Sequence, residues 1–197
     1  MNKPYSSACD NNRDPILSVI GPLFADYRAV LEVGSGTGQH AVYFAKKLPH
    51  LQWYTSDREE NHSGIQLWLD EAGLDNVHAP LSLDVMRNAW PDLCVDAVYS
   101  ANTAHIMHWD EVKKFFAGVG QFLPAQGLFV LYGPFNYDGR YTSESNERFD
   151  GWLKSQDKLM GIRDFADLNA LAETAGMLFV EDYTMPANNR ILCWRKA

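Results

Sequence analysis

The stretch AVLEVGSGTGQHAVYFAKK, residues 29–47, decides the fold. Its first five residues are valine-rich and apolar apart from one glutamate, which is typical of a short buried strand. The strand pattern stops at Gly34, and residues 39–48 carry apolar side chains on one side and lysines near their end, as in an amphipathic helix. A strand, a glycine-rich turn and a helix in this order indicate an α/β fold.

The same alternation continues along the chain. We predict seven strands, at residues 29–33, 51–56, 77–83, 95–100, 127–132, 178–183 and 190–195. We predict helices at residues 14–20, 39–48, 60–72, 110–122 and 165–175. Strands that alternate with helices of this length form a mainly parallel sheet through right-handed crossovers. The expected fold is therefore a Rossmann-like, seven-stranded, mostly parallel sheet with helices on both faces.

The two ends of the chain and one internal segment depart from this alternation. The lead through Asn12 is polar and expected to be irregular, and Asp14-Pro15 looks like a cap followed by the first residue of a helix. Residues 133–161 are rich in polar and aromatic residues without a strand pattern, so we expect a lid or substrate loop. The link 184–189 is too short for a helical crossover, which predicts an antiparallel C-terminal strand at the sheet edge.

Composition excludes several classes of function. The chain has 197 residues and a formal net charge of −8 at pH 7, so no electrostatic attraction to nucleic acid is expected. Its three cysteines are far apart, which favours reduced thiols over disulfides or a zinc site. No apolar run approaches the ~20 residues that cross a bilayer, and the start lacks a signal-peptide core. We expect one cytoplasmic domain, residues 1–197, without membrane contact.

The glycines of the turn, Gly34, Gly36 and Gly38, indicate a ligand site. Glycine permits the tight backbone torsions of such a turn and lets a ligand approach the main chain without a Cβ in the way. The loop can also turn the amino-terminal end of the following helix toward a polar or anionic ligand group. The alternative is a plain strand-to-helix turn without a ligand.

Glu32 followed by the GxGxG spacing closely resembles motif I of the class I S-adenosylmethionine-dependent methyltransferases. The resemblance implies that the glycine loop lies against the methionine part of this cofactor and that Glu32 organises its amino-group end. The dinucleotide fingerprint GxGxxG would place its third glycine where this chain has Gln39. A nicotinamide-dependent oxidoreductase is therefore the weaker alternative.

Two further aspartates follow predicted strands. Asp57 ends the second strand about 20 residues after the glycine loop, where a carboxylate accepts hydrogen bonds from ribose hydroxyls in doubly wound folds. It is alternatively a loop acid or a helix cap, and both roles can hold together. Asp84 follows the third strand, and the resemblance implies that it accepts a hydrogen bond from the adenine amino group; the alternative is a turn-forming surface acid.

The residues predicted to contact the methyl acceptor rest on less specific sequence patterns. By the resemblance, the segment after the fourth strand faces the substrate, so Asn102 would contact cofactor or substrate, and His105 would orient or deprotonate the acceptor. His108 completes an H-x-x-H pair, but no third ligand is apparent and we predict no metal. Arg13 is expected to bind a carboxylate or close over the cofactor, and Tyr137 to form part of a lid. Buried structural histidines and ordinary loop chemistry are the alternatives.

Four short segments resemble the methyltransferase-like twenty-six group, a family classed by a domain of unknown function. They are NNRDPIL at 11–17, GSGTGQH at 34–40, YGPF at 132–135 and MPANN at 185–189. The resemblance covers nearly the whole chain, although Asp10-Asn11-Asn12-Arg13 departs from the family's usual Arg-Asn-Arg beginning. It implies the fold and S-adenosylmethionine as the cofactor, and we predict methyl transfer to a small or medium-sized acceptor. A non-catalytic cofactor-binding module is the other hypothesis, and neither the acceptor nor the oligomeric state is indicated.

Overall fold

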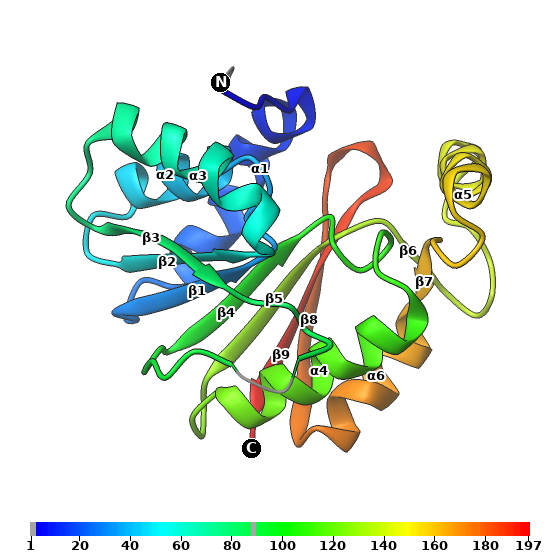
Figure 1. Ribbon diagram of the computed structural model, residues 1–197. Coiled ribbons are helices and arrows are strands. Elements are labelled where there is room, and N and C mark those ends of the chain that lie inside the picture. The colour runs from blue at the N-terminus through cyan, green and yellow to red at the C-terminus, as the bar shows by residue number, and fades with distance from the viewer. Residues whose placement is uncertain (1–2, 88–89) are drawn as a thin grey trace. The chain divides into compact units, whose positions relative to one another are not determined.

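The structure is a computed structural model that describes residues 3–87 and 90–197 (Figure 1). Its helices are α1 (Ser7–Leu23), α2 (Gln39–Lys47), α3 (Glu59–Ala72), α4 (Trp109–Phe122), α5 (Glu144–Gln156), α6 (Phe165–Thr174) and the short 3-10 helix η1 (Pro186–Asn188). Its strands are β1 (Ala29–Val33), β2 (Gln52–Asp57), β3 (Val77–Ser82), β4 (Ala97–Ala101), β5 (Leu128–Gly133), β6 (Phe135–Asn136), β7 (Arg163–Asp164), β8 (Met177–Thr184) and β9 (Arg190–Lys196).

Seven of the described strands form one sheet in the order β3-β2-β1-β4-β5-β9-β8. Strand β1 pairs in parallel with β2 and β4, whereas β9 is antiparallel to both β5 and β8. The predicted α/β class with an antiparallel C-terminal strand is confirmed. The expectation that this strand forms the edge is wrong, because β8 is the edge. Residues 191–194 of β9 are fully buried while most of β8 is exposed, so the more apolar strand takes the inner position.

By its internal contacts the chain divides into two compact units, Met1–Ser100 and Ala101–Ala197. In the first unit α2 packs against α1, α3 and β2, and α3 packs against β3. The core centres on three buried rings, with centroids 5.5 Å apart for Phe44 and Trp53 and 5.7 Å apart for Trp53 and Tyr99. This core supports β1 and β2, from whose ends the glycine loop and Asp57 project.

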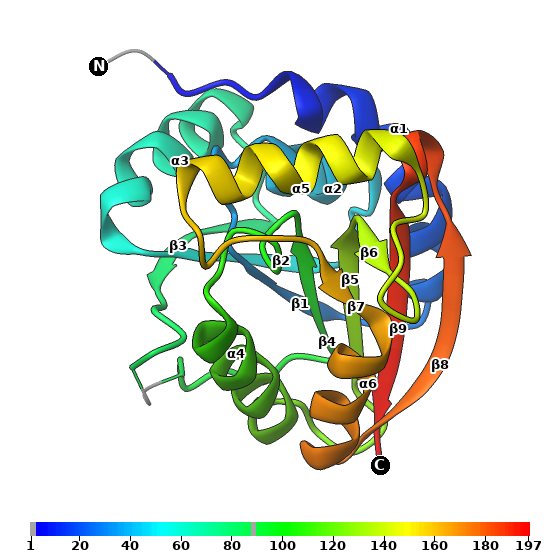
Figure 2. The ribbon, with the colours of Figure 1, turned by 90° about the vertical axis from the view of Figure 1, so that its right-hand side faces the viewer.

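In the second unit α4 packs against α6, and α6 packs against β8. Its core is also aromatic: Phe129 of β5 lies 5.3 Å from Phe116 and 5.5 Å from Trp194, measured between ring centroids. The short strands β6 and β7 form a separate parallel pair, with α5 between them in the sequence (Figure 2). No helix within residues 3–87 and 90–197 has the length and apolar character needed to cross a bilayer.

The first helix is longer than predicted. It begins at Ser7 instead of Asp14, so the expected irregular lead is wrong for residues 7–12; residues 1–2 lie outside the described residues. Pro15 lies inside the helix, where it removes one backbone hydrogen bond. The polar residues before it are held by side-chain contacts to α2, and Ile16 and Ile20 are fully buried, which together offset this loss.

Residues 133–161 contain a helix that the sequence analysis did not predict. The Ser143 side chain caps α5 by accepting a hydrogen bond from the Asn146 backbone N–H, at 3.1 Å. The buried face of α5 consists of Asn146, Asp150 and Leu153, so it shows no apolar periodicity. Asp150 is satisfied by the Lys154 ammonium, the Tyr141 hydroxyl and a backbone N–H. The expected role of this segment as a lid stays a prediction.

Candidate functional site

The glycine loop has three residues with positive φ: Gly34 at 76°, Gly36 at 58° and Gly38 at 89°. The two later glycines are required for different reasons. A Cβ on Gly38 would lie 3.2 Å from the Ile65 backbone, so this glycine lets α2 pack against α3. A Cβ on Gly36 would meet nothing within 4 Å. Packing therefore does not explain Gly36; its positive φ favours glycine, and the open space leaves its backbone accessible.

Hydrogen bonds hold the loop against the end of β2. The backbone N–H groups of Gly34 and Ser35 both donate to the Ser56 carbonyl oxygen, each at 3.0 Å. The Gly36 N–H donates to the Asp57 carboxylate at 2.7 Å. The loop is thus fixed in shape without a ligand, which lowers the entropic cost of binding one.

Glu32 lies beneath the loop and is only 2% exposed. One of its carboxylate oxygens accepts hydrogen bonds from the Trp53 indole at 3.1 Å and from the Ser35 hydroxyl at 3.0 Å. Burial raises the pKa of Glu32 to about 7, and these two donors oppose the rise. The sequence analysis missed Trp53, whose only signal was an indole in the strand beside Glu32.

Asp57 serves as a structural connector. Beyond the bond from Gly36, its carboxylate accepts hydrogen bonds from the Arg58 N–H at 2.7 Å and the Asn61 amide at 2.8 Å. The N-cap of α3 is Arg58 and has no side-chain capping bond, so Asp57 contacts the start of the helix without capping it. A carboxylate offers about four acceptor positions, so capacity for a further donor remains.

Asp84 forms a turn just after β3. Its carboxylate accepts the Met86 N–H at 3.0 Å, and its carbonyl oxygen accepts the Arg87 N–H at 2.9 Å. The turn borders an open cavity of about 260 Å³, lined by Arg58, Glu59, Glu60, Ser82, Asp84 and Arg87. The turn-former alternative is observed, and the same carboxylate faces a space able to hold a ligand group.

Arg13 lies within α1 and not in a loop before it. Its guanidinium pairs with Asp10 at 2.6 Å and stands 4.8 Å from the centre of the Tyr43 ring. Its buried Nε has no hydrogen-bond partner within residues 3–87 and 90–197. These contacts explain the position of Arg13 in the helix, and its expected role toward a ligand stays a prediction.

Asn102 and His105 both lie beside the end of β5 in the second unit. Asn102 has a left-handed backbone, with φ of 59°, and its N–H donates to the Tyr132 carbonyl at 2.9 Å. Such a backbone conformation is uncommon outside glycine and recurs at functional sites. The Nδ1 of His105 lies 3.8 Å from where a Cβ of Gly133 would stand. The Tyr137 hydroxyl is hydrogen-bonded to Asp182 instead.

The His105 imidazole is 7% exposed and packs edge-on against Phe149, with ring centroids 5.3 Å apart. The described residues make no side-chain hydrogen bond to the ring, and its nitrogens are not among their fully buried, unpartnered atoms. Burial, together with the nearby Arg163 guanidinium, lowers the pKa of His105 to about 4. The imidazole is therefore neutral at pH 7, and the same lowering makes it a weaker base than a free imidazole.

The backbone around His105 is held firmly. The Gly161 N–H donates to the His105 carbonyl at 3.0 Å. The Arg163 guanidinium donates to the Ala104 carbonyl at 3.1 Å and also to the Met107 carbonyl. Arg163 was not singled out from the sequence, because a lone arginine before a helix carries no distinctive signal. Its bonds fix the turn that carries the imidazole.

His108 and Tyr137 make structural contacts. The His108 ring bonds Asp157 at 2.8 Å and, with Glu111, caps the start of α4. The Tyr137 hydroxyl donates to Asp182 at 2.6 Å, and burial with this bond raises the pKa of Tyr137. Within the described residues, no three His, Cys, Asp or Glu side chains cluster as metal ligands would.

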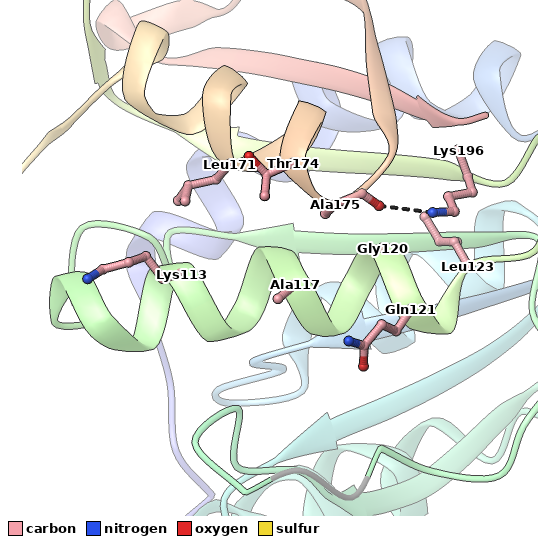
Figure 3. A pocket seen from close by; sticks show the side chains of 9 residues that line it. All are labelled: Lys113, Ala117, Gly120, Gln121, Leu123, Leu171, Thr174, Ala175 and Lys196. Atoms are coloured by element: carbon pink, nitrogen blue, oxygen red, sulfur yellow. Dashed lines mark hydrogen bonds between the residues drawn. The ribbon is translucent and has the colours of Figure 1, made fainter.

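The second unit also contains an open cavity of about 470 Å³ between α4 and α6 (Figure 3). A Cβ on Gly120 would lie 2.4 Å from the Ala175 carbonyl oxygen, so the two helices touch at this glycine. The Lys196 ammonium donates to the same carbonyl oxygen at 2.9 Å. None of the residues predicted for the site borders this cavity.

Residues 3–196 match the sequence family described as "Protein of unknown function (DUF938)". The chain belongs to this family. The match covers both compact units and includes every residue that the sequence analysis proposed for the site.

The fold is similar to that of solved methyltransferases. An O-methyltransferase family protein from Burkholderia thailandensis matches with a TM-score of 0.85 at 14% identity, over 96% of this chain and 56% of its own. Mitomycin 7-O-methyltransferase matches with a TM-score of 0.85 at 18% identity, over 97% and 55%. Human N-acetylserotonin methyltransferase, solved with S-adenosylmethionine, matches with 0.79 at 14%, over 96% and 53%. This chain thus spans a little over half the length of these proteins.

Proposed function

We propose that this protein is an S-adenosylmethionine-dependent methyltransferase acting on a small or medium-sized acceptor, with residues 1–197 forming one methyltransferase domain. Within its family we place it in the methyltransferase-like twenty-six group, on the segments quoted above. The observation that carries the proposal is Gly36, a glycine with a positive φ whose missing side chain would meet no protein atom. Its positive φ by itself favours glycine, and the empty space beside its backbone is where we propose that the ligand approaches.

The residues around the loop supply what this cofactor needs. Glu32 would attract the amino group of the methionine part, and Asp57 would accept hydrogen bonds from the ribose. Asp84 would accept one from the adenine amino group, and the similarity to solved methyltransferases supports these roles. Asn102 remains a proposed cofactor contact. When bound, the cofactor supplies a methyl group already activated on a sulfonium.

The chain's own task in the reaction is to orient the acceptor, exclude water and hold a proton. His105 is the group proposed to take the acceptor's proton, since it is buried, neutral at pH 7 and without a partner among the described residues. The solved neighbours named O-methyltransferases favour a hydroxyl acceptor. Arg13 and Tyr137 remain proposed as acceptor-side residues.

The first test compares two glycines with the same backbone. Gly36 and Gly73 have φ of 58° and 56°, and a Cβ on either would meet nothing within 4 Å. Alanine at either position costs about 1 kcal/mol of backbone strain. Calorimetric titration with S-adenosylmethionine should show at least a 100-fold weaker Kd for Gly36→Ala and an unchanged Kd for Gly73→Ala.

NADH serves as the comparison ligand. Saturable binding of S-adenosylmethionine without binding of NADH supports the proposed cofactor. No binding of S-adenosylmethionine by the unsubstituted protein would overturn the proposed function, and equal loss of affinity in both alanine variants would overturn the glycine loop as its site.

A further inference from the structure

Residues 3–14, here called the strap, run along the first unit beside the middle and end of α3 and then along α2. The Trp68 indole donates to the Pro4 carbonyl at 2.7 Å, and the Lys3 ammonium stands 3.6 Å above the Trp68 ring. A Cβ on Gly64 would lie 2.7 Å from Pro4, so α3 has no room for a side chain there. The strap is therefore docked on α3 before it reaches the glycine loop.

Gln39, the residue directly after the glycine loop, is hydrogen-bonded to the strap at Ser6. Its side-chain oxygen accepts the Ser6 N–H at 2.6 Å, and its side-chain nitrogen donates to the Ser6 carbonyl at 3.2 Å. The same oxygen accepts the Thr37 hydroxyl at 3.0 Å, and Gln39 is 4% exposed. This amide thus joins the loop to the strap at the position where a dinucleotide fingerprint has glycine.

His40 makes a second hydrogen bond to the strap. Its Nε2 lies 2.7 Å from the Asn12 side-chain oxygen, and both residues are buried. Burial lowers the pKa of His40 to about 4, so the ring is neutral, and its tautomer decides which of the two side chains donates. An apolar pair would pack α1 against α2 equally well, but a buried polar pair accepts only one register of the two helices.

The strap and the glycine loop share one acceptor, because the Gln39 side-chain oxygen accepts both the Ser6 N–H and the Thr37 hydroxyl. Burial raises the pKa of the Cys9 thiol, and the Glu32 carboxyl group and the Thr37 hydroxyl act on it in opposite directions. Resting on the proposed function, we propose that the strap forms a wall of the S-adenosylmethionine site beside Thr37. Gln39 and His40 are the positioning residues that set this wall.

The experiment uses Cys9 as a reporter. In a Cys94→Ser background the exposed thiol is gone, and Cys193 is fully buried with its pKa raised to about 12. Labelling by iodoacetamide at pH 8.5, followed by mass spectrometry, then reports Cys9. Saturating S-adenosylmethionine should slow its labelling at least tenfold. Gln39→Ala should speed the labelling of the free protein severalfold and weaken the Kd for S-adenosylmethionine about tenfold.

The matched control is Asn76→Ala. The Asn76 amide donates to the Ala45, Leu48 and Leu51 carbonyls, at the opposite end of α2 from the strap. Its loss should destabilise the protein at least as much as Gln39→Ala while leaving Cys9 labelling and the Kd unchanged within twofold. Asn12→Ala removes the hydrogen bond to His40, and it should change Cys9 labelling and the Kd as Gln39→Ala does.

The outcomes separate this inference from the proposed function. If the protein binds S-adenosylmethionine but Cys9 is labelled equally fast with and without it, the strap is not a wall of the site and the inference fails alone. The inference also fails if Gln39→Ala and Asn76→Ala change the Kd equally. If the unsubstituted protein binds no S-adenosylmethionine, both the inference about the strap and the proposed function fail.

Discussion

In the unit of residues 1–100, the buried carboxyl group of Glu32 receives hydrogen bonds from Trp53 and Ser35. In the unit of residues 101–197, the buried imidazole of His105 receives none from the described residues and packs against Phe149. Burial moves both groups toward their neutral forms, raising the pKa of Glu32 to about 7 and lowering that of His105 to about 4. The two sites differ in partners rather than in burial.

This difference in hydrogen bonding suits one group to ligand binding and the other to proton transfer. A carboxyl group held by fixed donors presents its remaining lone pairs in one direction, which suits a group that binds. Neither His105 ring nitrogen is among the fully buried atoms that lack a partner in the described residues, and the described residues make no hydrogen bond to the ring. For His105 we infer a role in chemistry, because an imidazole that its neighbours leave unbonded can take a proton from an acceptor.

The largest effect is expected for His105→Gln, which keeps a polar side chain but removes the proton acceptor. Transfer of a labelled methyl group from S-adenosylmethionine to a metabolite extract should fall about 10²- to 10⁴-fold, the usual contribution of a general base. The Kd for S-adenosylmethionine should stay within twofold.

His108→Gln is the matched control. It removes a ring that bonds Asp157 and caps α4, so stability should fall by about 1 kcal/mol while methyl transfer changes only a few-fold. Equal losses of transfer in both variants would break the distinction between the two histidines.

A smaller effect should appear in stability at acidic pH. The native protein binds the His105 proton only below about pH 4, whereas the unfolded chain binds it below the ordinary pKa of 6.5. The unfolded state therefore holds more protons between these values, and the free energy of unfolding rises with pH there. His105→Gln should remove about 2 kcal/mol of this rise between pH 4.5 and 6.5, measured by urea unfolding.

Glu32→Gln should change the slope in the opposite direction. Native Glu32 keeps its proton up to about pH 7 while the unfolded chain releases it near 4.5, so this group makes stability fall as pH rises. Removing it should steepen the rise across the same window. His40, whose pKa burial also lowers, contributes equally to all three proteins. Parallel stability curves would contradict the assigned pKa directions.

The sequence predicted those parts of the fold where local pattern and tertiary environment agree. The strand at 29–33 and the helix that Gly73 closes were found because a buried strand is apolar and a left-handed cap needs glycine. The start of α1 and the whole of α5 were missed because Asn12, Asn146 and their neighbours are polar residues buried by tertiary hydrogen bonds. Hydrophobic periodicity cannot register such residues.

The candidate site divides in the same way. Glu32 and Gly36 were predicted because their spacing is local, a few residues along one strand and turn. Trp53 and Gln39 were missed as site residues because their roles depend on what lies opposite them: a carboxyl group on the neighbouring strand, and a backbone 33 residues earlier. Those partners depend on strand register and on how α2 packs against the strap, and neither can be predicted from a single sequence.

The smallest predicted effect would sharpen the assignment of Glu32 to binding. If its ionised form attracts the cofactor's amino group, which is largely protonated up to pH 7.5, affinity must rise with pH as Glu32 ionises near pH 7. The ionised fraction implies a Kd about eightfold tighter at pH 7.5 than at pH 6, measurable by calorimetry.

Two variants decide whether Glu32 is the cause. Glu32→Gln should bind more weakly and with no pH dependence over this range, because no carboxyl group remains to ionise. Trp53→Phe keeps the ring but removes the indole donor that holds the pKa of Glu32 down, so its affinity midpoint should move to higher pH. A pH dependence that survives in Glu32→Gln would assign it to another group and leave Glu32 as a structural carboxyl group.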